Sequence, residues 1–345
     1  MLVRESPRVE LSGAEGSPRV ERRFASFGTE RGGRLREPGR SKHRRERSDR
    51  GPQQVPGPEP VGAFELVAVA VAVSIFAAYL NTTVLRTHRL NTHRVEPAGV
   101  LPTAINLYSV RALDEPLFET IDRVADAGYD GVQFSGGLDG NDPADVRDRL
   151  DDHGLDAVGP HVGVGELESD PDATAGTYRD LGTSALVVPY LDPDAFESRE
   201  TVEATADRLS KVAEDFDSRG FDLHYHNHDH EFVALDGRTA FERLFDAAPG
   251  LGAEIDVGWV ATAGHDPEAL LREYGDRLSL VHMKDMHTSE GAFAEIGEGD
   301  VDMAACADAA HDVDADWLIY EHDDPENPVE SIETGASFLG SLRDN

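Results

Sequence analysis

The 345-residue sequence contains a single cysteine, Cys306, which excludes an intrachain disulfide and a cysteine-based zinc cluster. After residue 100 the sequence also has only two lysines, Lys211 and Lys284. It has no glycine-rich nucleotide-binding loop after a strand, because the segment 297–300 (GEGD) is too short to form one. These absences predict a protein of a reducing compartment, the cytoplasm, that uses no nucleotide cofactor.

Positive charge is scarce over the same part of the chain. Residues 1–100 carry a formal net charge of +6, whereas residues 101–345 carry −41. A surface this acidic repels nucleic-acid phosphates, so we expect no nucleic-acid partner. An acidic, lysine-poor surface is typical of proteins from a salt-rich, halophilic cytoplasm. An acidic enzyme from an ordinary cytoplasm is the alternative.

The first hundred residues divide into three segments by composition. Residues 1–60 are rich in Arg, Gly, Pro, Ser and Glu and lack apolar periodicity, which predicts a disordered, basic extension. Residues 61–85 contain one charge, Glu65, and form a candidate membrane anchor of borderline length, since a bilayer span needs about 20 apolar residues. Residues 86–100 are a linker. The alternative is an extension without a role, with the functional chain beginning near Val100; we expect the first hundred residues to add nothing to the folded core.

Residues 101–345 contain eight short apolar runs that alternate with segments of helical periodicity. Strands that alternate with helices pair in parallel through crossover connections. Eight such units predict an α/β fold of the (β/α)8 barrel type, a TIM barrel, with a doubly wound open sheet as the alternative. The predicted strands are 103–108, 130–134, 155–161, 184–189, 221–226, 252–257, 278–283 and 316–321.

The carboxyl ends of the strands identify candidate site residues, because active sites of such barrels lie there. The last four strands end with His226, Asp256, His282 and Glu321. Two imidazoles with two carboxylates suit one divalent ion such as Mn, Co, Zn or Fe, with Mg as a further candidate. We therefore predict one metal ion bound by these four residues. A purely structural role for each of them is the alternative.

Other polar residues near these strand ends are candidates for catalysis and substrate binding. Lys284 follows His282 by two positions, so both side chains point the same way, and Lys284 could donate to a developing oxyanion. An ion pair of Lys284 with Asp285 or Glu298 is the alternative. Substrate-binding residues are predicted at His161, Asn106 and Trp259.

Strand alternation also predicts a contact deeper in the barrel. His224 shares a face with His226, and Glu254 shares a face with Asp256, each one step further from the carboxyl end. Because a buried carboxylate and a buried imidazole both need partners, we expect His224 and Glu254 to meet beneath the metal.

Seven motifs recur in one known group of barrels. They are Asn106-Leu107-Tyr108-Ser109, Gly128-Tyr129-Asp130-Gly131-Val132, His226-Asn227-His228, Asp256-Val257-Gly258-Trp259, Val281-His282-Met283-Lys284-Asp285, Gly297-Glu298-Gly299 and Glu321. With these motifs, essentially all of residues 101–345 resembles the xylose-isomerase-like TIM-barrel superfamily, which includes sugar phosphate isomerases and epimerases, inosose dehydratase and endonuclease IV. The motifs are specific for the superfamily and not for a substrate.

The resemblance implies a metal site that this sequence alters at one position. In the epimerase branch, Glu, Asp, His and Glu from the last four strands hold the metal, and the two glutamates move the proton. The last three correspond to Asp256, His282 and Glu321, whereas His226 stands in place of the first glutamate. Glu321 remains the candidate base, and His228 or Glu231 is the candidate second acid/base.

These observations predict a divalent-metal-dependent isomerase or epimerase of a sugar, sugar phosphate or polyol, which abstracts a proton next to a carbonyl. The alternatives are a metal-dependent hydratase or dehydratase of a keto-sugar or inosose, a lyase, and a barrel that binds a sugar without catalysis. The expected partners are the small-molecule substrate and a second copy in a homo-oligomer. A membrane is a partner only if residues 61–85 are an anchor.

The charge of residues 101–345 predicts a salt-dependent fold. Self-repulsion between acidic side chains acts over about 30 Å at about 0.01 M salt and is screened at high salt. The melting temperature should therefore be higher in molar KCl than in dilute buffer, as measured by circular dichroism. Equal melting temperatures in the two solutions would refute the halophilic interpretation.

Overall fold

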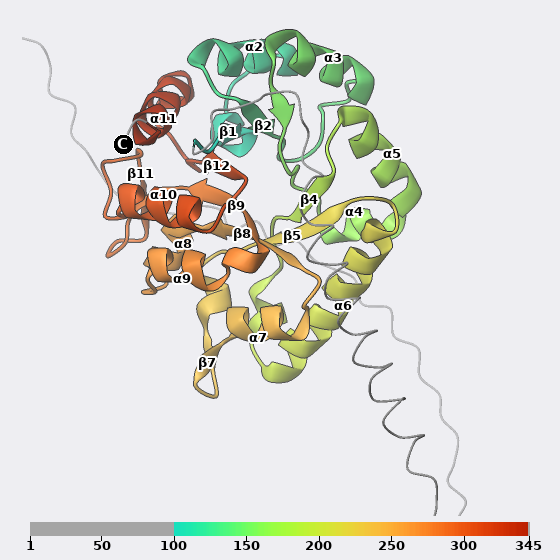
Figure 1. Ribbon diagram of the computed structural model, residues 1–345, viewed down its shortest axis with the longest axis vertical. Coiled ribbons are helices and arrows are strands. Elements are labelled where there is room, and N and C mark those ends of the chain that lie inside the picture. The colour runs from blue at the N-terminus through green and yellow to red at the C-terminus, as the bar shows by residue number, and fades with distance from the viewer. Residues whose placement is uncertain (1–99, 344–345) are drawn as a thin grey trace, which may run out of the picture. The chain divides into compact units, whose positions relative to one another are not determined.

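The computed structural model describes residues 100–343, and Figure 1 shows them as a ring of strands surrounded by helices. The expected disordered extension, apolar segment and linker fall in residues 1–99 and so lie outside the described residues. Within the described residues, no helix combines the length and the apolar character that a membrane crossing requires.

All eight predicted strands are present and pair in parallel in one sheet. Their order in the sheet is β3-β2-β1-β12-β9-β8-β5-β4, so the first strand of the chain pairs with the last. The strands are β1 (Thr103–Asn106), β2 (Gly131–Gln133), β3 (Asp156–Ala157), β4 (Ala185–Val188), β5 (Asp222–His226), β8 (Gly252–Asp256), β9 (Leu278–Met283) and β12 (Trp317–Tyr320).

The sheet closes into a barrel between β3 and β4 through one residue, His161. It forms parallel bridges with Ser135, which follows β2, and with Val187 of β4. The predicted strand 155–161 is interrupted because Gly159 has a φ of 42°, in the left-handed region that strands do not use. The (β/α)8 barrel is therefore confirmed, and the doubly wound open sheet is excluded.

Helices in the connections cover the outside of the strands, as Figure 1 shows. They are α2 (Leu117–Ala127), α3 (Pro143–His153), α4 (Val164–Ser169), α5 (Pro171–Leu181), α6 (Arg199–Asp217), α7 (Ala240–Ala247), α8 (Val257–Thr262), α9 (Pro267–Glu273), α10 (Met303–Asp312) and α11 (Pro328–Leu342). Short 3-10 helices lie at η1 (Leu107–Val110), η2 (Pro193–Phe196), η3 (His230–Phe232) and η4 (Gly275–Arg277). Two hairpins, β6 (Ala234–Leu235) with β7 (Arg238–Thr239) and β10 (Asp285–His287) with β11 (Ala292–Ala294), lie in the connections after β5 and β9.

Aspartate and proline mark the start of several helices. Asp142, Asp170 and Asp266 each accept a hydrogen bond from a backbone N–H in the first turn of α3, α5 and α9, and a proline follows each of them. Proline suits the first helical position, and a carboxylate is stabilised by the positive end of the helix dipole. Part of the acidity of the sequence is therefore used to begin helices.

Side chains inside the barrel form an apolar layer and, nearer the carboxyl ends of the strands, a polar layer. The apolar layer consists of Ala104, Val158, Val187, Leu280 and Ile319. Alternate side chains of a strand point to the same face. The residues two positions further along β1, β9 and β12 therefore enter the polar layer, and they are Asn106, His282 and Glu321. The larger apolar core lies between the strands and the helices.

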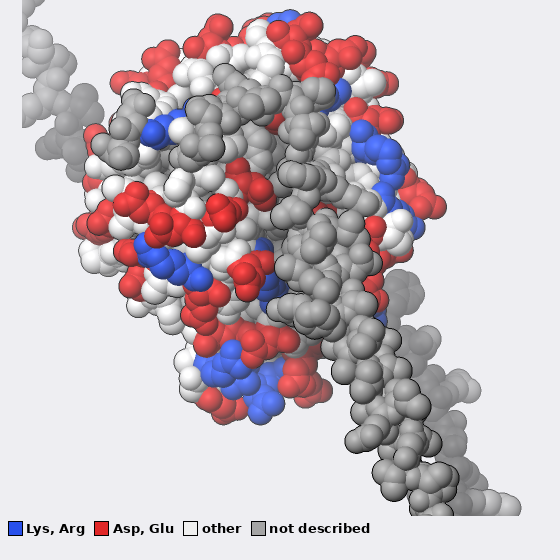
Figure 2. Space-filling model, viewed as in Figure 1, with Lys and Arg blue, Asp and Glu red and all other residues white. Residues whose placement is uncertain are grey.

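Acidic side chains are spread over the face shown in Figure 2, with fewer basic side chains between them. Some of the basic groups form ion pairs, as in Arg208–Glu168 (2.6 Å) and Arg219–Asp172 (2.9 Å). Such exposed pairs contribute about 0–1 kcal/mol each. The excess of acidic groups therefore stays largely unneutralised by the protein itself.

The packing of α11 against the barrel generates a prediction about two glycines of that helix. A Cβ at Gly335 would lie 2.5 Å from Tyr129 Oη and 2.6 Å from Tyr320 Cγ, whereas a Cβ at Gly340 meets no atom within 4 Å. Gly335→Ala should lower the free energy of unfolding by about 1–3 kcal/mol through overpacking. Gly340→Ala should raise it by up to about 1 kcal/mol, because alanine favours the helix. Urea denaturation measures both, and equal effects of the two changes would contradict the close approach at Gly335.

Candidate metal centre

Strands β5, β8, β9 and β12 bring the four predicted ligands to one end of the barrel. His226 and Asp256 end their strands, His282 pairs in register with Asp256, and Glu321 directly follows β12. The ligand atoms of these four side chains all lie within 4.8 Å of one another, and all four residues are buried. Such a group could hold a metal ion.

Asp256 has one oxygen fixed by the backbone and one directed at the histidines. Its Oδ1 accepts a hydrogen bond from Trp259 N (3.0 Å) at the start of α8. Asn227 holds the backbone of Asp256 in place, because its Oδ1 accepts from Asp256 N (3.0 Å). The buried Oδ2 atom forms an ion pair with Lys284 Nζ (3.1 Å) and lies 3.9 Å from His226 Nε2 and 4.0 Å from His282 Nδ1.

Lys284 adds a positive charge beside these ligands. Its Nζ lies 3.1 Å from Asp256 Oδ2, 3.0 Å from Glu321 Oε2 and 2.8 Å from Asp323 Oδ1. Burial would lower the pKa of Lys284, but the carboxylates of Asp256 and Glu321 outweigh burial and raise it above its usual range. Lys284 is therefore charged at neutral pH.

An ion pair of Lys284 with Asp285, which was one alternative considered from the sequence, does not form. The Asp285 carboxylate instead accepts hydrogen bonds from the backbone N–H groups of Gly297 (2.9 Å), Gly299 (2.9 Å) and Val301 (3.2 Å). Asp285 thus fixes the loop that follows β11. The partners of Lys284 come from β8 and from the segment after β12, which no local pattern could indicate.

The two carboxylates of the predicted metal site differ in their protonation. Burial raises the pKa of Asp256 to about 6, against the opposing effect of Lys284. Burial would also raise the pKa of Glu321, but Lys284 and His282 hold it well below its usual range. At neutral pH, Glu321 is therefore the more firmly ionised of the two carboxylates.

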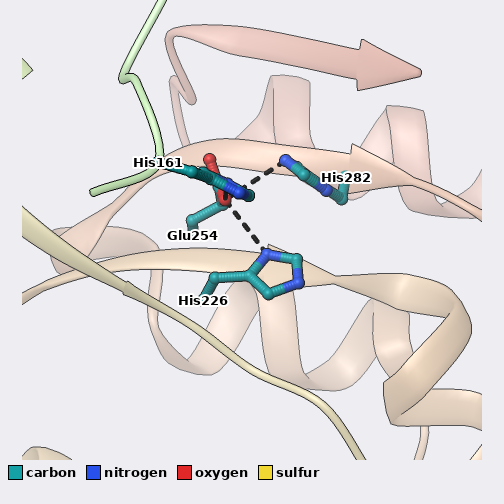
Figure 3. Close-up of side chains that lie close together, drawn as sticks. All are labelled: His161, His226, Glu254 and His282. Carbon is teal, nitrogen blue, oxygen red and sulfur yellow. Dashed lines mark hydrogen bonds and ion pairs between the residues drawn. The ribbon is translucent and has the colours of Figure 1, made fainter. Parts of the chain in front are cut away.

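A second group of close side chains surrounds Glu254, as Figure 3 shows. Glu254 Oε1 lies 2.6 Å from His161 Nε2, 3.0 Å from His226 Nδ1 and 3.1 Å from His282 Nε2. Its Oε2 accepts a hydrogen bond from Gln133 Nε2 (2.6 Å). Burial opposes ionisation, but His282 and His161 outweigh it and hold the pKa of Glu254 well below its usual range. Glu254 is thus an ionised carboxylate between three imidazoles.

The expected pairing of Glu254 with His224 is corrected by the strand register. His226 pairs with Glu254, whereas His224 pairs with Gly252 and its ring occupies the space beside that glycine. Glu254 is therefore level with the histidine ligand and not one step below it. Gln133, which the sequence did not single out, completes its surroundings.

Spacing decides which of the two groups fits a metal ion. Ligands held at about 2.1 Å by one ion are separated from each other by roughly 3.0–3.4 Å. Around Glu254 the separation falls to 2.6 Å, which is a hydrogen-bond length. Around Asp256 Oδ2 the separations to the two histidines are 3.9 Å and 4.0 Å, which leave a gap for an ion, whereas His282 Nδ1 and Glu321 Oε2 are 2.9 Å apart and would have to separate slightly. The group of His226, Asp256, His282 and Glu321 therefore fits a metal ion better, with small movements of its side chains.

Charge on the imidazoles follows their surroundings. Burial lowers the pKa of His226 to about 4, despite its hydrogen bond to Glu254. For His282, burial acts in the same direction, but Glu254 and Glu321 outweigh it and raise the pKa to about 10. His282 is therefore positively charged at neutral pH, and its charge partly neutralises the two carboxylates.

The structure places the candidate substrate-binding residues at two depths. Asn106 and His161 belong to the buried layer, where Asn106 Nδ2 donates to Gln133 Oε1 (2.7 Å) and lies 3.4 Å from His161 Nδ1. Trp259 lies nearer the opening, with its ring 5.0 Å from Lys284 Nζ and 5.6 Å from the His228 ring. Of these three, Trp259 is the one best placed to meet a substrate.

The two candidates for a second acid/base also differ in position. His228 lies beside the metal group, its ring 5.0 Å from that of His226, and burial lowers its pKa to about 2. Glu231 accepts hydrogen bonds from Tyr225 Oη (2.6 Å) and from His228 N (2.8 Å). These contacts hold the loop after β5 in place, and burial raises the pKa of Glu231.

Comparison with known proteins identifies the family. Residues 121–342 match the family described as xylose isomerase-like TIM barrel. Among curated proteins, an inosose dehydratase from Geobacillus kaustophilus is 26% identical over 194 residues, which are 49% of this chain and 61% of that protein. The match thus spans about three fifths of the relative.

Solved structures show the same fold at low identity. A sugar phosphate isomerase/epimerase from Parabacteroides distasonis aligns with a TM-score of 0.62 and 19% identity over 74% of this chain and 99% of its own. The IOLI protein with a bound zinc atom aligns with a TM-score of 0.58 and 15% identity over 71% of this chain and 98% of its own. The chain belongs to the xylose isomerase-like TIM barrel family.

Proposed function

We propose that this chain is a divalent-metal-dependent isomerase or epimerase that acts on a sugar, sugar phosphate or polyol by abstracting a proton next to a carbonyl. The observation that carries the proposal is the convergence of His226, Asp256, His282 and Glu321 at the carboxyl ends of four strands. A sugar phosphate isomerase/epimerase among the similar structures supports it, whereas the inosose dehydratase supports the second candidate function given below.

The donor set fits a divalent ion such as Zn, Mn, Co or Fe. Two imidazole nitrogens and two carboxylate oxygens converge within 4.8 Å of one another, and all four residues are buried. When bound there, the ion supplies Lewis-acid chemistry by polarising a substrate carbonyl. The zinc atom in the structure of the IOLI protein supports zinc as one candidate.

Glu321 is our proposed base. Its pKa lies well below its usual range, because Lys284 and His282 outweigh the effect of burial, so the carboxylate is ionised at neutral pH. A carboxylate beside the substrate carbonyl is within reach of the neighbouring C–H group, which is the geometric requirement for a base. The proton removed from carbon would reside on Glu321 before its return.

Lys284 is our proposed electrophile. Its ammonium group lies 3.0 Å from Glu321 Oε2 and 3.1 Å from Asp256 Oδ2. Because it stays protonated, it stabilises negative charge that develops on a substrate oxygen next to the base. Trp259 forms the adjacent wall, with its ring 5.0 Å from Lys284 Nζ.

A dehydratase is the second candidate function, and His226 favours it. An epimerase that inverts a carbon needs an acid/base on each side of the substrate, and the resemblance gave that second role to a glutamate where this chain has His226. A dehydratase needs one base for the C–H proton and one donor for the departing hydroxyl. Glu321 would take the C–H proton and pass it to the departing hydroxyl, which leaves as water, while Lys284 stays protonated and stabilises negative charge on the substrate oxygen.

The metal assignment predicts the effect of single substitutions on ion binding. Asp256→Asn should weaken Mn²⁺ or Zn²⁺ binding at least tenfold, because it removes a charged ligand whose Oδ2 faces both histidines. Glu333→Gln, a change on the exposed side of α11, serves as the matched control and should leave binding unchanged. Isothermal titration calorimetry measures both affinities. Equal affinities in the two variants would exclude Asp256 as a ligand.

Isotope exchange in deuterated water, with a panel of sugars, sugar phosphates and inososes as substrates, distinguishes the two reaction types. An isomerase or epimerase should introduce one deuterium into a product of unchanged composition, and a dehydratase should give a product that has lost water. Glu321→Gln, assayed at a metal concentration that saturates the variant, should slow either reaction by about 10²–10⁴-fold. Ligand binding with neither exchange nor loss of water would identify a sugar-binding barrel instead.

A further inference from the structure

Glu254 lies at the centre of the polar layer and touches both proposed imidazole ligands. Its side chain is fully buried, and Figure 3 shows it between His161, His226 and His282. His226 approaches it through Nδ1 at 3.0 Å, whereas His282 approaches it through Nε2 at 3.1 Å. The two histidines therefore turn opposite ring nitrogens toward the same carboxylate.

The nitrogens that face away from Glu254 are the ones that face the proposed ion. His226 Nε2 is directed at Asp256 Oδ2 (3.9 Å), and His282 Nδ1 is directed at Glu321 Oε2 (2.9 Å). A neutral imidazole that donates through one nitrogen offers a lone pair at the other. A proton on His226 Nδ1, held against Glu254, thus leaves the Nε2 lone pair on the side of Asp256. His282 would offer Nδ1 to an ion once the proton that it shares with Glu321 is displaced.

One backbone N–H group fixes the donor and acceptor directions of the hydrogen bonds that lead to Glu254. Tyr108 N donates to Asn106 Oδ1 (2.8 Å), which fixes the orientation of that amide and makes its Nδ2 a donor. Asn106 Nδ2 donates to Gln133 Oε1 (2.7 Å), so Gln133 presents its own Nε2 to Gly159 O (2.9 Å) and to Glu254 Oε2. Each amide therefore has a single orientation that satisfies its neighbours.

The same two amides determine where the histidine protons lie. Gln133 Oε1 accepts from His282 Nε2 (2.7 Å), so that nitrogen carries a proton. Asn106 Nδ2 lies 3.4 Å from His161 Nδ1, which must then be the acceptor, and the His161 proton lies on Nε2 next to Glu254. The carboxylate of Glu254 is the common acceptor at the end of these chains.

We propose that Glu254 is a positioning residue that fixes the ring orientation and the tautomer of His226 and, together with Gln133, the ring orientation of His282, with Asn106 fixing the amide of Gln133. The proposal rests on the proposed function for the identity of the metal site. The arrangement is that of outer carboxylates that hold metal-binding histidines through their second nitrogen. Only a carboxylate serves here, because a carboxamide has one acceptor oxygen and would turn an N–H₂ group toward either the imidazole donors or Gln133.

The first test measures Co²⁺ binding to the full chain and to Glu254→Gln. Loss of the outer carboxylate should weaken Co²⁺ binding by about 10–100-fold and shift the visible absorption bands of bound Co²⁺, which report the geometry of the ligands. Glu295→Gln is the control, since Glu295 also binds side chains, Tyr320 and Ser331, but touches no proposed ligand. Wild-type affinity and spectrum in folded Glu254→Gln would overturn the proposal.

The second test moves the charge to the neighbouring residue. In the double variant Gln133→Glu with Glu254→Gln, the new amide donates to the new carboxylate, which accepts from Asn106 and His282. Gly159 O loses its donor, so we expect a partial recovery, with Co²⁺ binding at least fivefold tighter than in Glu254→Gln alone. A double variant that binds as weakly as the single variant would contradict the network described here.

A third measurement needs no metal. In metal-free protein with ¹⁵N-labelled histidine, long-range ¹H–¹⁵N spectra distinguish the Nδ1–H from the Nε2–H tautomer. His226 should be in the Nδ1–H form in the wild type and lose it in Glu254→Gln. If wild-type protein shows this tautomer but binds no Co²⁺, the proposed metal function fails while the positioning role stands; the Nε2–H tautomer in the wild type overturns the positioning role.

Discussion

The burial of one negative charge at the centre of the barrel determines the arrangement of its polar layer. An isolated carboxylate in such a place would cost several kcal/mol, so Glu254 must be surrounded by donors. His161, His226, His282 and Gln133 supply those donors from four different strands or strand ends. Each donor in turn faces a second group, and so the charge of Glu254 organises side chains that reach as far as Asp256 and Glu321.

Local sequence pattern was sufficient to predict the fold and the four residues that converge at one end of the barrel. Apolar runs alternating with helical periodicity gave all eight strands, and the rule that barrel sites lie at strand ends selected His226, Asp256, His282 and Glu321. The interruption at Gly159 was not predicted, because the apolar run itself does not indicate the left-handed φ or the close approach of Leu280 and Val187 from other strands. Whether the four residues bind a metal remains a prediction.

Contacts across the barrel could not be derived from the sequence. The prediction for Glu254 failed because it assumed that His224 and Glu254 are level, whereas the register of β5 with β8 pairs His226 with Glu254 and His224 with Gly252. The sequence suggested nearby residues of the chain as ion-pair partners of Lys284. In the structure, Lys284 instead contacts Asp256, Glu321 and Asp323 from adjacent parts of the barrel. The stagger between neighbouring strands sets the distances between side chains of different strands. The periodicity of residues along one strand gives no information about this stagger.

The seam of the barrel depends on a residue that also belongs to its centre. The backbone of His161 joins β2 to β4, while its side chain holds the carboxylate between the proposed ligands. His161 therefore both closes the sheet and contacts the buried carboxylate of Glu254. A displacement of His161 would therefore change both the closure of the sheet and the surroundings of the Glu254 carboxylate.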